Sequence, residues 1–142
     1  MSWNKNDLIP ESEIKEKVTN VTVDFAKRFG SYLGTDDLNP KTGKPSGNKL
    51  TTNQLRKFFG EVKRQQMSGY NQTDFVLLKP KLAYAVGRAK NPNAKINDFY
   101  RVISKAIDKV DNEQQFKNFI KIFEAIVAYH KAAEESKLVD NE

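Results

Sequence analysis

The sequence predicts an all-α protein, a compact bundle of about five helices. Apolar residues recur at intervals of three and four over several long segments, and no segment shows the strict alternation of a half-buried strand. The chain has 142 residues, of which 38% are hydrophobic, enough for one domain with a buried core. We expect a single bundle domain over residues 12–137, between a flexible N-terminal tail at 1–11 and a C-terminal tail at 138–142.

The first helix is expected from about Ser12 to Leu33, just after Pro10, which suits a helix start. Its apolar residues would form one buried stripe: Ile14, Val18, Val21, Phe25, Phe29 and Tyr32. Trp3 precedes this helix in a polar stretch, where we expect it to be frayed or docked on a partner. The following residues, 34–50, hold three Gly and two Pro among polar residues and are expected to form a mobile polar loop.

The second helix has a clear start signal, because Thr51 and Gln54 have the spacing of a capping box. One side of this helix is apolar and the other is basic. The apolar stripe comprises Leu55, Phe58, Phe59 and Val62, and the basic side comprises Arg56, Lys57, Lys63 and Arg64.

A short helical turn near Asp74 to Leu78 and a third helix from Pro80 to Ala89 are expected next, because proline is tolerated in a first helical turn. In the third helix Leu82 faces inward, whereas Lys81, Tyr84 and Arg88 share another face.

Two further helices complete the bundle, one from about Ala94 to Val110 and one from Asp111 or Asn112 to about Ser136. The apolar arc of the last helix covers about half of its circumference. An arc of that width marks either the central helix of the bundle or a surface shared with another subunit.

Catalytic groups are scarce in this sequence. The single histidine, His130, falls on the inner stripe of the last helix and is expected to be a buried structural residue. With no second histidine and no cysteine, the sequence offers neither a metal site nor a nucleophile–base pair. The segment Gly43-Lys44-Pro45-Ser46 lacks the upstream glycine and the preceding strand of a phosphate-binding loop. We therefore expect a binding protein without an active site and without a cofactor.

The formal net charge of +6 is concentrated in the middle of the chain. Residues 41–109 carry fifteen basic and four acidic side chains, whereas residues 1–40 have a net charge of −2 and residues 110–142 of −3. A concentrated basic region attracts polyanions, chiefly nucleic acid. The alternative is a solvated, lysine-rich surface with no nucleic-acid partner.

Helical spacing groups these cations on common faces at phosphate spacing. Arg56, Lys63 and Arg64 form one set. Lys81 and Arg88 form a second set, with Tyr84 between them, whose ring can stack on a base or sugar while the cations hold phosphates. The alternative is that Tyr84 packs on a neighbouring helix and that Arg88 pairs with an acid.

Two segments, LTTNQLRKFFGEV at 50–62 and LKPKLAYAVGRAK at 78–90, resemble the small helical subunit of type III-A CRISPR effector complexes, the Csm interference complex. The order of elements is similar as well: a helix, a polar linker, an L-T-x-x-Q-L-R helix start, a K-L-A-Y-x-x-G-R helix and two last helices. The resemblance covers roughly residues 12–136.

This resemblance implies a non-catalytic subunit of an RNA-guided complex that acts in antiviral defence. In that family several copies stack head to tail beside the backbone subunits, and their basic surface lies along the duplex of guide RNA and target RNA. Cleavage belongs to the backbone and large subunits. The expected partners are therefore the guide RNA and the target RNA, bound without reading their sequence, the backbone and large subunits, and further copies of the chain.

The resemblance also assigns residues to the RNA-binding surface. Its motifs place Arg56, Lys81, Tyr84 and Arg88 there. Charge placement, outside the motifs, adds further basic side chains: Lys57, Lys63, Arg64, Lys79 and Lys90.

Two other functions remain open from the sequence. One is a helix-turn-helix-like DNA-binding regulator built from the second and third helices, although the link from Val62 to Phe75 is longer than the usual turn. The other is a protein-interaction adaptor whose positive charge only aids solubility. No apolar run is long enough to cross a bilayer and no N-terminal stretch resembles a signal peptide, so we expect a cytoplasmic protein with no membrane partner.

Overall fold

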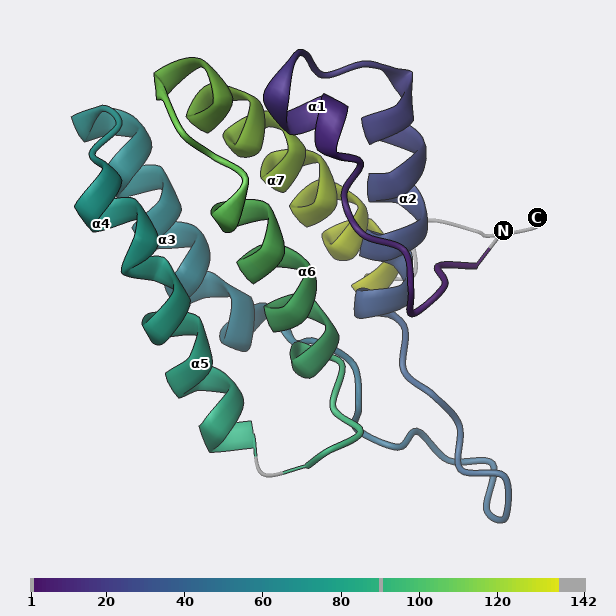
Figure 1. Cartoon of the computed structure of the whole chain (residues 1–142). Helices are drawn as coiled ribbons and strands as arrows, with labels where there is room; N and C mark the ends of the chain where they lie inside the picture. The colour runs from purple at the N-terminus through teal and green to yellow at the C-terminus, as the bar shows by residue number, and fades with distance from the viewer. Residues whose placement is uncertain (1, 90, 136–142) are drawn as a thin grey trace.

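A computed structural model describes residues 2–89 and 91–135 of the chain (Figure 1). Its helices, in order, are α1 (Glu11–Lys15), α2 (Asn20–Gly34), α3 (Thr52–Ser68), α4 (Gln72–Val76), α5 (Leu78–Ala89), α6 (Ile96–Asp108) and α7 (Glu113–Glu134). The described residues contain no β-strand, only an isolated bridge between Leu38 and Pro45. The predicted all-α bundle is confirmed, and residues 2–89 and 91–135 form five long helices and two helices of five residues each.

The longest helix, α7, lies at the centre of the bundle. It packs against α1, α2 and α3, while α5 packs against α6 and α3. In Figure 1, α2 and α3 lie on opposite sides of the molecule, with α7 and α6 between them. The apolar arc of α7 is buried within its own chain through Phe116, Phe119, Ile120, Ile122, Phe123 and Ile126. This burial favours the central-helix alternative for the wide arc.

Phenylalanine rings join the helices around α7. The Phe58 ring of α3 lies edge-on to Phe99 of α6 and Phe123 of α7, with centroid distances of 5.8 and 5.7 Å. Phe75 of α4 lies edge-on to Phe119 of α7 at 5.1 Å. Such pairs contribute about 0.5–1.5 kcal/mol each beyond the burial of their area. The rings therefore fix α3, α4 and α6 on one central helix.

The backbones of α2 and α7 are in direct contact. A Cβ atom at Gly30 would lie 2.7 Å from the carbonyl oxygen of Ile126, and one at Gly34 would lie 2.5 Å from the carbonyl oxygen of His130. Backbone atoms cannot rotate away from such an overlap as a flexible side chain can. Glycine at both positions, one helical turn apart, therefore sets the distance between the two helices.

The predicted first helix is divided into α1 and α2, which is a correction to the sequence analysis. Glu13 is buried, and its carboxylate accepts hydrogen bonds of 2.7–3.0 Å from the backbone N–H and hydroxyl groups of Thr19 and Thr22. These bonds satisfy the free N–H groups at the start of α2, so the chain turns instead of continuing as a helix. Val21, predicted to be buried, is 51% exposed because the stripe is interrupted before it.

The N-terminal segment packs on the bundle, so the prediction that Trp3 is frayed or docked on a partner is wrong. The Trp3 side chain is 5% exposed, and its ring lies 4.7 Å from Phe29 and 4.8 Å from Tyr32. Ile9 is buried as well. The expected flexible tail therefore contributes Trp3 and Ile9 to the core. The expected C-terminal tail at 138–142 lies outside the described residues.

The polar loop between α2 and α3 projects from the bundle (Figure 1), but both of its ends are held. The Asp36 carboxylate accepts hydrogen bonds from the Ser46 hydroxyl and from the backbone N–H groups of residues 47–48. The buried Lys95 ammonium lies 3.1 Å from Asp37 and donates to two carbonyl oxygens at the end of α2. The loop therefore leaves and rejoins the bundle at a fixed place.

Local signals at three helix positions are confirmed. Thr51 and Gln54 form the predicted capping box at the start of α3. The side chain of Asn112 caps α7 by accepting a hydrogen bond from a backbone N–H of its first turn. His130 is buried, with its Nε2 atom 2.6 Å from the carbonyl oxygen of Leu50. Its role is therefore structural, because it joins α7 to the residues that lead into α3.

Replacing Gly30 by alanine should destabilise the bundle by roughly 1–3 kcal/mol, because the new methyl group overlaps the backbone of α7. Gly60→Ala is the matched control, since a Cβ atom there meets nothing within 4 Å. Alanine is the better helix former by about 1 kcal/mol, so the control should be neutral or stabilising. Urea unfolding followed by circular dichroism measures both changes. Equal midpoints for Gly30→Ala and the unchanged protein would contradict the backbone contact.

Glu13 makes stability depend on pH. Burial raises the pKa of Glu13, but the hydrogen bonds from Thr22 and Thr19 outweigh burial and leave the pKa below its ordinary value. A carboxyl with a lowered pKa stabilises the fold above its unfolded pKa of about 4.3, and this contribution is lost as the pH falls. We expect the free energy of unfolding to fall between about pH 5 and pH 3, and to fall less in Glu13→Gln. Urea titrations at a series of pH values test this, and an equal fall in both proteins would contradict it.

Candidate nucleic-acid interface

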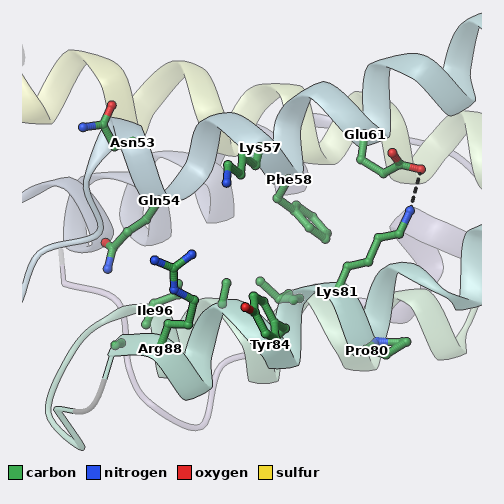
Figure 2. A pocket seen from close by; sticks show the side chains of 13 residues that line it. Asn53, Gln54, Lys57, Phe58, Glu61, Pro80, Lys81, Tyr84, Arg88 and Ile96 are labelled. Carbon is green, nitrogen blue, oxygen red and sulfur yellow. Dashed lines mark ion pairs between the residues drawn. The ribbon is translucent and has the colours of Figure 1, made fainter.

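A groove of about 830 Å³ lies between α3 and α5 (Figure 2). We call it the α3–α5 groove. It is lined by Asn53, Gln54, Lys57, Phe58, Glu61, Pro80, Lys81, Leu82, Tyr84, Ala85, Arg88, Ala89 and Ile96. Phe58, Leu82 and Ile96 are buried at its base, and they join α3, α5 and α6. The base is therefore a part of the core, and the polar side chains stand around it.

The face of α5 predicted from helical spacing is directed toward this groove. Lys81, Tyr84 and Arg88 all line it, as expected for positions three, four and seven apart. Seven residues of helix span about 10 Å along the axis, so the two cations are separated along the groove. Leu82, on another side of α5, is buried as predicted.

Tyr84 and Arg88 are free to meet a ligand. The Tyr84 side chain is 71% exposed, so its ring does not pack on a neighbouring helix. Arg88 has no carboxylate partner among the described residues, and Figure 2 shows its guanidinium directed across the groove toward α3. The alternative in which Tyr84 is packed and Arg88 is neutralised by an acid is therefore not what the structure shows.

Lys57 and Arg56 are neighbours on α3, but they point in different directions. Lys57 lines the groove, and Figure 2 shows its side chain reaching into it from the wall opposite Arg88. Arg56 is exposed and does not line the groove, because one residue of helix turns the side chain by about 100°. Neither side chain has an acidic partner in the part of the chain that the structure describes.

Four of the basic residues singled out from the sequence are held in ion pairs. Lys63 lies 2.5 Å from Glu124 of α7, and Lys79 lies 2.5 Å from Asp108 of α6, both outside the groove. Arg64 and Lys81 share one carboxylate, Glu61, at 2.5 and 3.0 Å. Lys90, also singled out, lies outside the described residues. The structure therefore brings Lys57, Lys81, Tyr84 and Arg88 together in the groove, and leaves Arg56, Lys63, Arg64 and Lys79 outside it.

Glu61 is a feature of the groove that the sequence analysis missed. A hydrogen bond from Arg64 is the largest cause that lowers the pKa of Glu61 to about 2; Lys81 and Gln65 lower it further and burial opposes them. This carboxyl is therefore ionised at neutral pH. The pair of Glu61 with Arg64 could have been predicted from the sequence, because residues three apart on one helix are neighbours. The pair of Glu61 with Lys81 could not, because these residues meet only through the packing of α3 against α5.

The groove has the composition of a binding surface. Among the described residues, its lining contains three cations and one carboxylate, together with an exposed tyrosine. Within the described residues, no three acidic or histidine side chains gather where they could hold a metal ion. No helix of the same residues has both the length and the apolar character needed to cross a membrane. The arrangement suits a polyanion that also offers flat or apolar groups to the tyrosine.

Comparison with known protein families finds a match over most of the chain. The family model described as Csm2 Type III-A matches residues 16–136. These residues include α2 to α7 and therefore both walls of the groove. Comparison with curated proteins and with solved structures found no match.

Proposed function

The chain belongs to the Csm2 Type III-A family, the small subunits of type III-A CRISPR complexes, and we propose that it holds RNA in the α3–α5 groove without cutting it. Its ligand there is the backbone of the duplex formed by guide RNA and target RNA. Lys57 and Arg88 bind phosphates from opposite walls, and Tyr84 contacts a sugar or an exposed base. The subunit works in the cytoplasm, together with the backbone and large subunits of the complex.

One observation carries this proposal: an exposed tyrosine stands between two cations on α5, opposite a third cation on α3. A lysine-rich surface that only aids solubility has no need of an aromatic ring that is 71% exposed. Tyrosine stacks on any base or sugar, and lysine and arginine bind any phosphate. The groove can thus hold RNA of any sequence, which is what a target read by base pairing requires.

Several copies acting together would give the subunit its useful affinity. A groove whose described lining holds three cations engages few phosphates, so a single copy binds weakly. Neighbouring copies on one RNA, held by the backbone and large subunits, raise the effective concentration of each groove. The subunit then bridges its neighbours as well as holding RNA. Val76, Leu77 and Met67, which are large apolar side chains exposed near α4, are candidate contacts for those neighbours.

The DNA-regulator alternative is not favoured. A helix-turn-helix joins its two helices by a turn of three or four residues. Here α4 intervenes between α3 and α5, and the two long helices are the walls of one groove. Neither helix is therefore free to enter a major groove as a separate recognition helix.

Replacing Arg88 by alanine should weaken binding of the full chain to a short RNA duplex by roughly fivefold, because one charge-assisted contact is lost. The slope of log affinity against log salt should become shallower by about 0.9. Lys57→Ala should act in the same way. Fluorescence anisotropy at several salt concentrations measures both quantities, and circular dichroism checks that the helices are intact.

Lys17→Ala is the charge-matched control, because Lys17 is exposed between α1 and α2, away from the groove. It should leave both the affinity and the salt slope nearly unchanged. Arg56→Ala tells whether the RNA surface extends around α3 beyond the groove. Equal losses in Arg88→Ala and Lys17→Ala would contradict the groove as the RNA site. Tight binding to one DNA duplex sequence would favour the regulator, and an acidic protein partner bound without RNA would favour the adaptor.

A further inference from the structure

Glu61 is the one carboxylate among the residues that line the α3–α5 groove. It faces Lys81 across the groove at 3.0 Å, as Figure 2 shows, and accepts from Arg64 of its own helix at 2.5 Å. A single acid thus holds Lys81, which lines the groove, and Arg64, which does not. While Glu61 holds them, neither cation is fully available to a phosphate.

The cations that Glu61 holds remain within reach of a ligand. The Glu61 side chain is only 20% exposed, but the side chains of Lys81 and Arg64 are more than half exposed. The walls of the groove are already joined by the buried Phe58, Leu82 and Ile96. Glu61 also accepts a hydrogen bond from the buried Gln65 amide at 3.2 Å, but an uncharged oxygen at the same place could accept it equally well.

The negative charge of Glu61 opposes the ligand proposed for this groove. A phosphate that approaches Lys81 meets the Glu61 carboxylate at short range and must compete with it for the ammonium. The long side chain of Lys81 has three donors and can turn from one anion to the other. When Lys81 or Arg64 binds an RNA phosphate, it therefore gives up its ion pair with Glu61.

We propose that Glu61 limits the affinity of a single subunit for RNA by holding Lys81 and Arg64, so that only RNA engaged by several adjacent subunits is retained. This inference rests on the proposed RNA-binding function of the groove. Weak binding by each copy suppresses capture of RNA by the free subunit, because such RNA gains nothing from neighbouring grooves. By weakening RNA binding at each groove, Glu61 therefore makes the retention of RNA depend on several assembled subunits.

The substitution Glu61→Gln tests this, because glutamine keeps an acceptor oxygen of similar size and removes the charge. Binding of the full chain to a short RNA duplex should tighten roughly three- to tenfold at low salt. The slope of log affinity against log salt should become steeper by about 0.9 for each further phosphate that Lys81 or Arg64 engages. Anisotropy titrations at several salt concentrations give both values.

Glu11→Gln is the matched control, because it removes the same charge and breaks an ion pair of the same length. Glu11 lies 3.0 Å from Lys109, away from the groove. It should change affinity and salt slope much less than Glu61→Gln. If the two variants tighten binding equally, net charge alone is responsible and the proposal for Glu61 is overturned. Binding unchanged by Glu61→Gln overturns it as well.

A double-mutant cycle separates failure of this inference from failure of the proposed function. Lys81→Ala should weaken binding more in the Glu61→Gln background than in the unchanged protein, because only there is Lys81 fully available to RNA. Equal effects in both backgrounds would show that Glu61 does not control Lys81. Arg88→Ala reports on the groove itself, since Arg88 is not held by Glu61. If Arg88→Ala weakens binding while Glu61→Gln changes nothing, the result supports the groove as the RNA site and contradicts only the role proposed for Glu61.

Discussion

The close contact of α2 with α7 at Gly30 and Gly34 sets the position of everything else in the bundle. Because two helix backbones touch there, α7 is held at the centre and its remaining sides receive α1 and α3. The end of α7 then determines where α3 begins. His130 lies against the carbonyl oxygen of Leu50, and the Glu134 carboxylate accepts hydrogen bonds from the backbone and the hydroxyl of Thr52. A displacement of α2 on α7 would therefore move one wall of the groove.

The groove is a consequence of how two pairs of helices meet. The Phe58 ring contacts α6 and α7, so α3 is tied to the centre, while α5 is carried on α6. Apolar side chains fill the base where the two walls approach, and the polar side chains of both walls are left facing each other above it. Side chains that are far apart in sequence, such as Lys57 and Arg88, become opposite sides of one surface. Rigid walls lower the entropic cost of ordering these side chains around a ligand.

Local patterns of the sequence predict much of this arrangement, and the rest depends on contacts between segments that are far apart in the chain. Periodicity predicted the long helices and the shared face of Lys81, Tyr84 and Arg88, because both follow from the geometry of one helix. It failed for the first helix, where the apolar spacing continues but buried Glu13 ends α1 by capping α2. Trp3 was missed because nothing near it in sequence shows the rings that cover it. The family motifs placed Arg56 on one surface with Lys81, Tyr84 and Arg88, and only the orientation of α3 separates Arg56 from the groove.

Ultraviolet cross-linking of target RNA to the assembled complex, followed by mass spectrometry of tryptic peptides, tests the central claim most directly. Trypsin cuts after Lys81 and Arg88, so Tyr84 is released in the peptide 82–88. If the α3–α5 groove holds RNA, this peptide carries the cross-linked nucleotide, since an exposed tyrosine stands there between two cations. Cross-links confined to peptides from α1, α2 or the loop after α2, with 82–88 unmodified, would contradict the account.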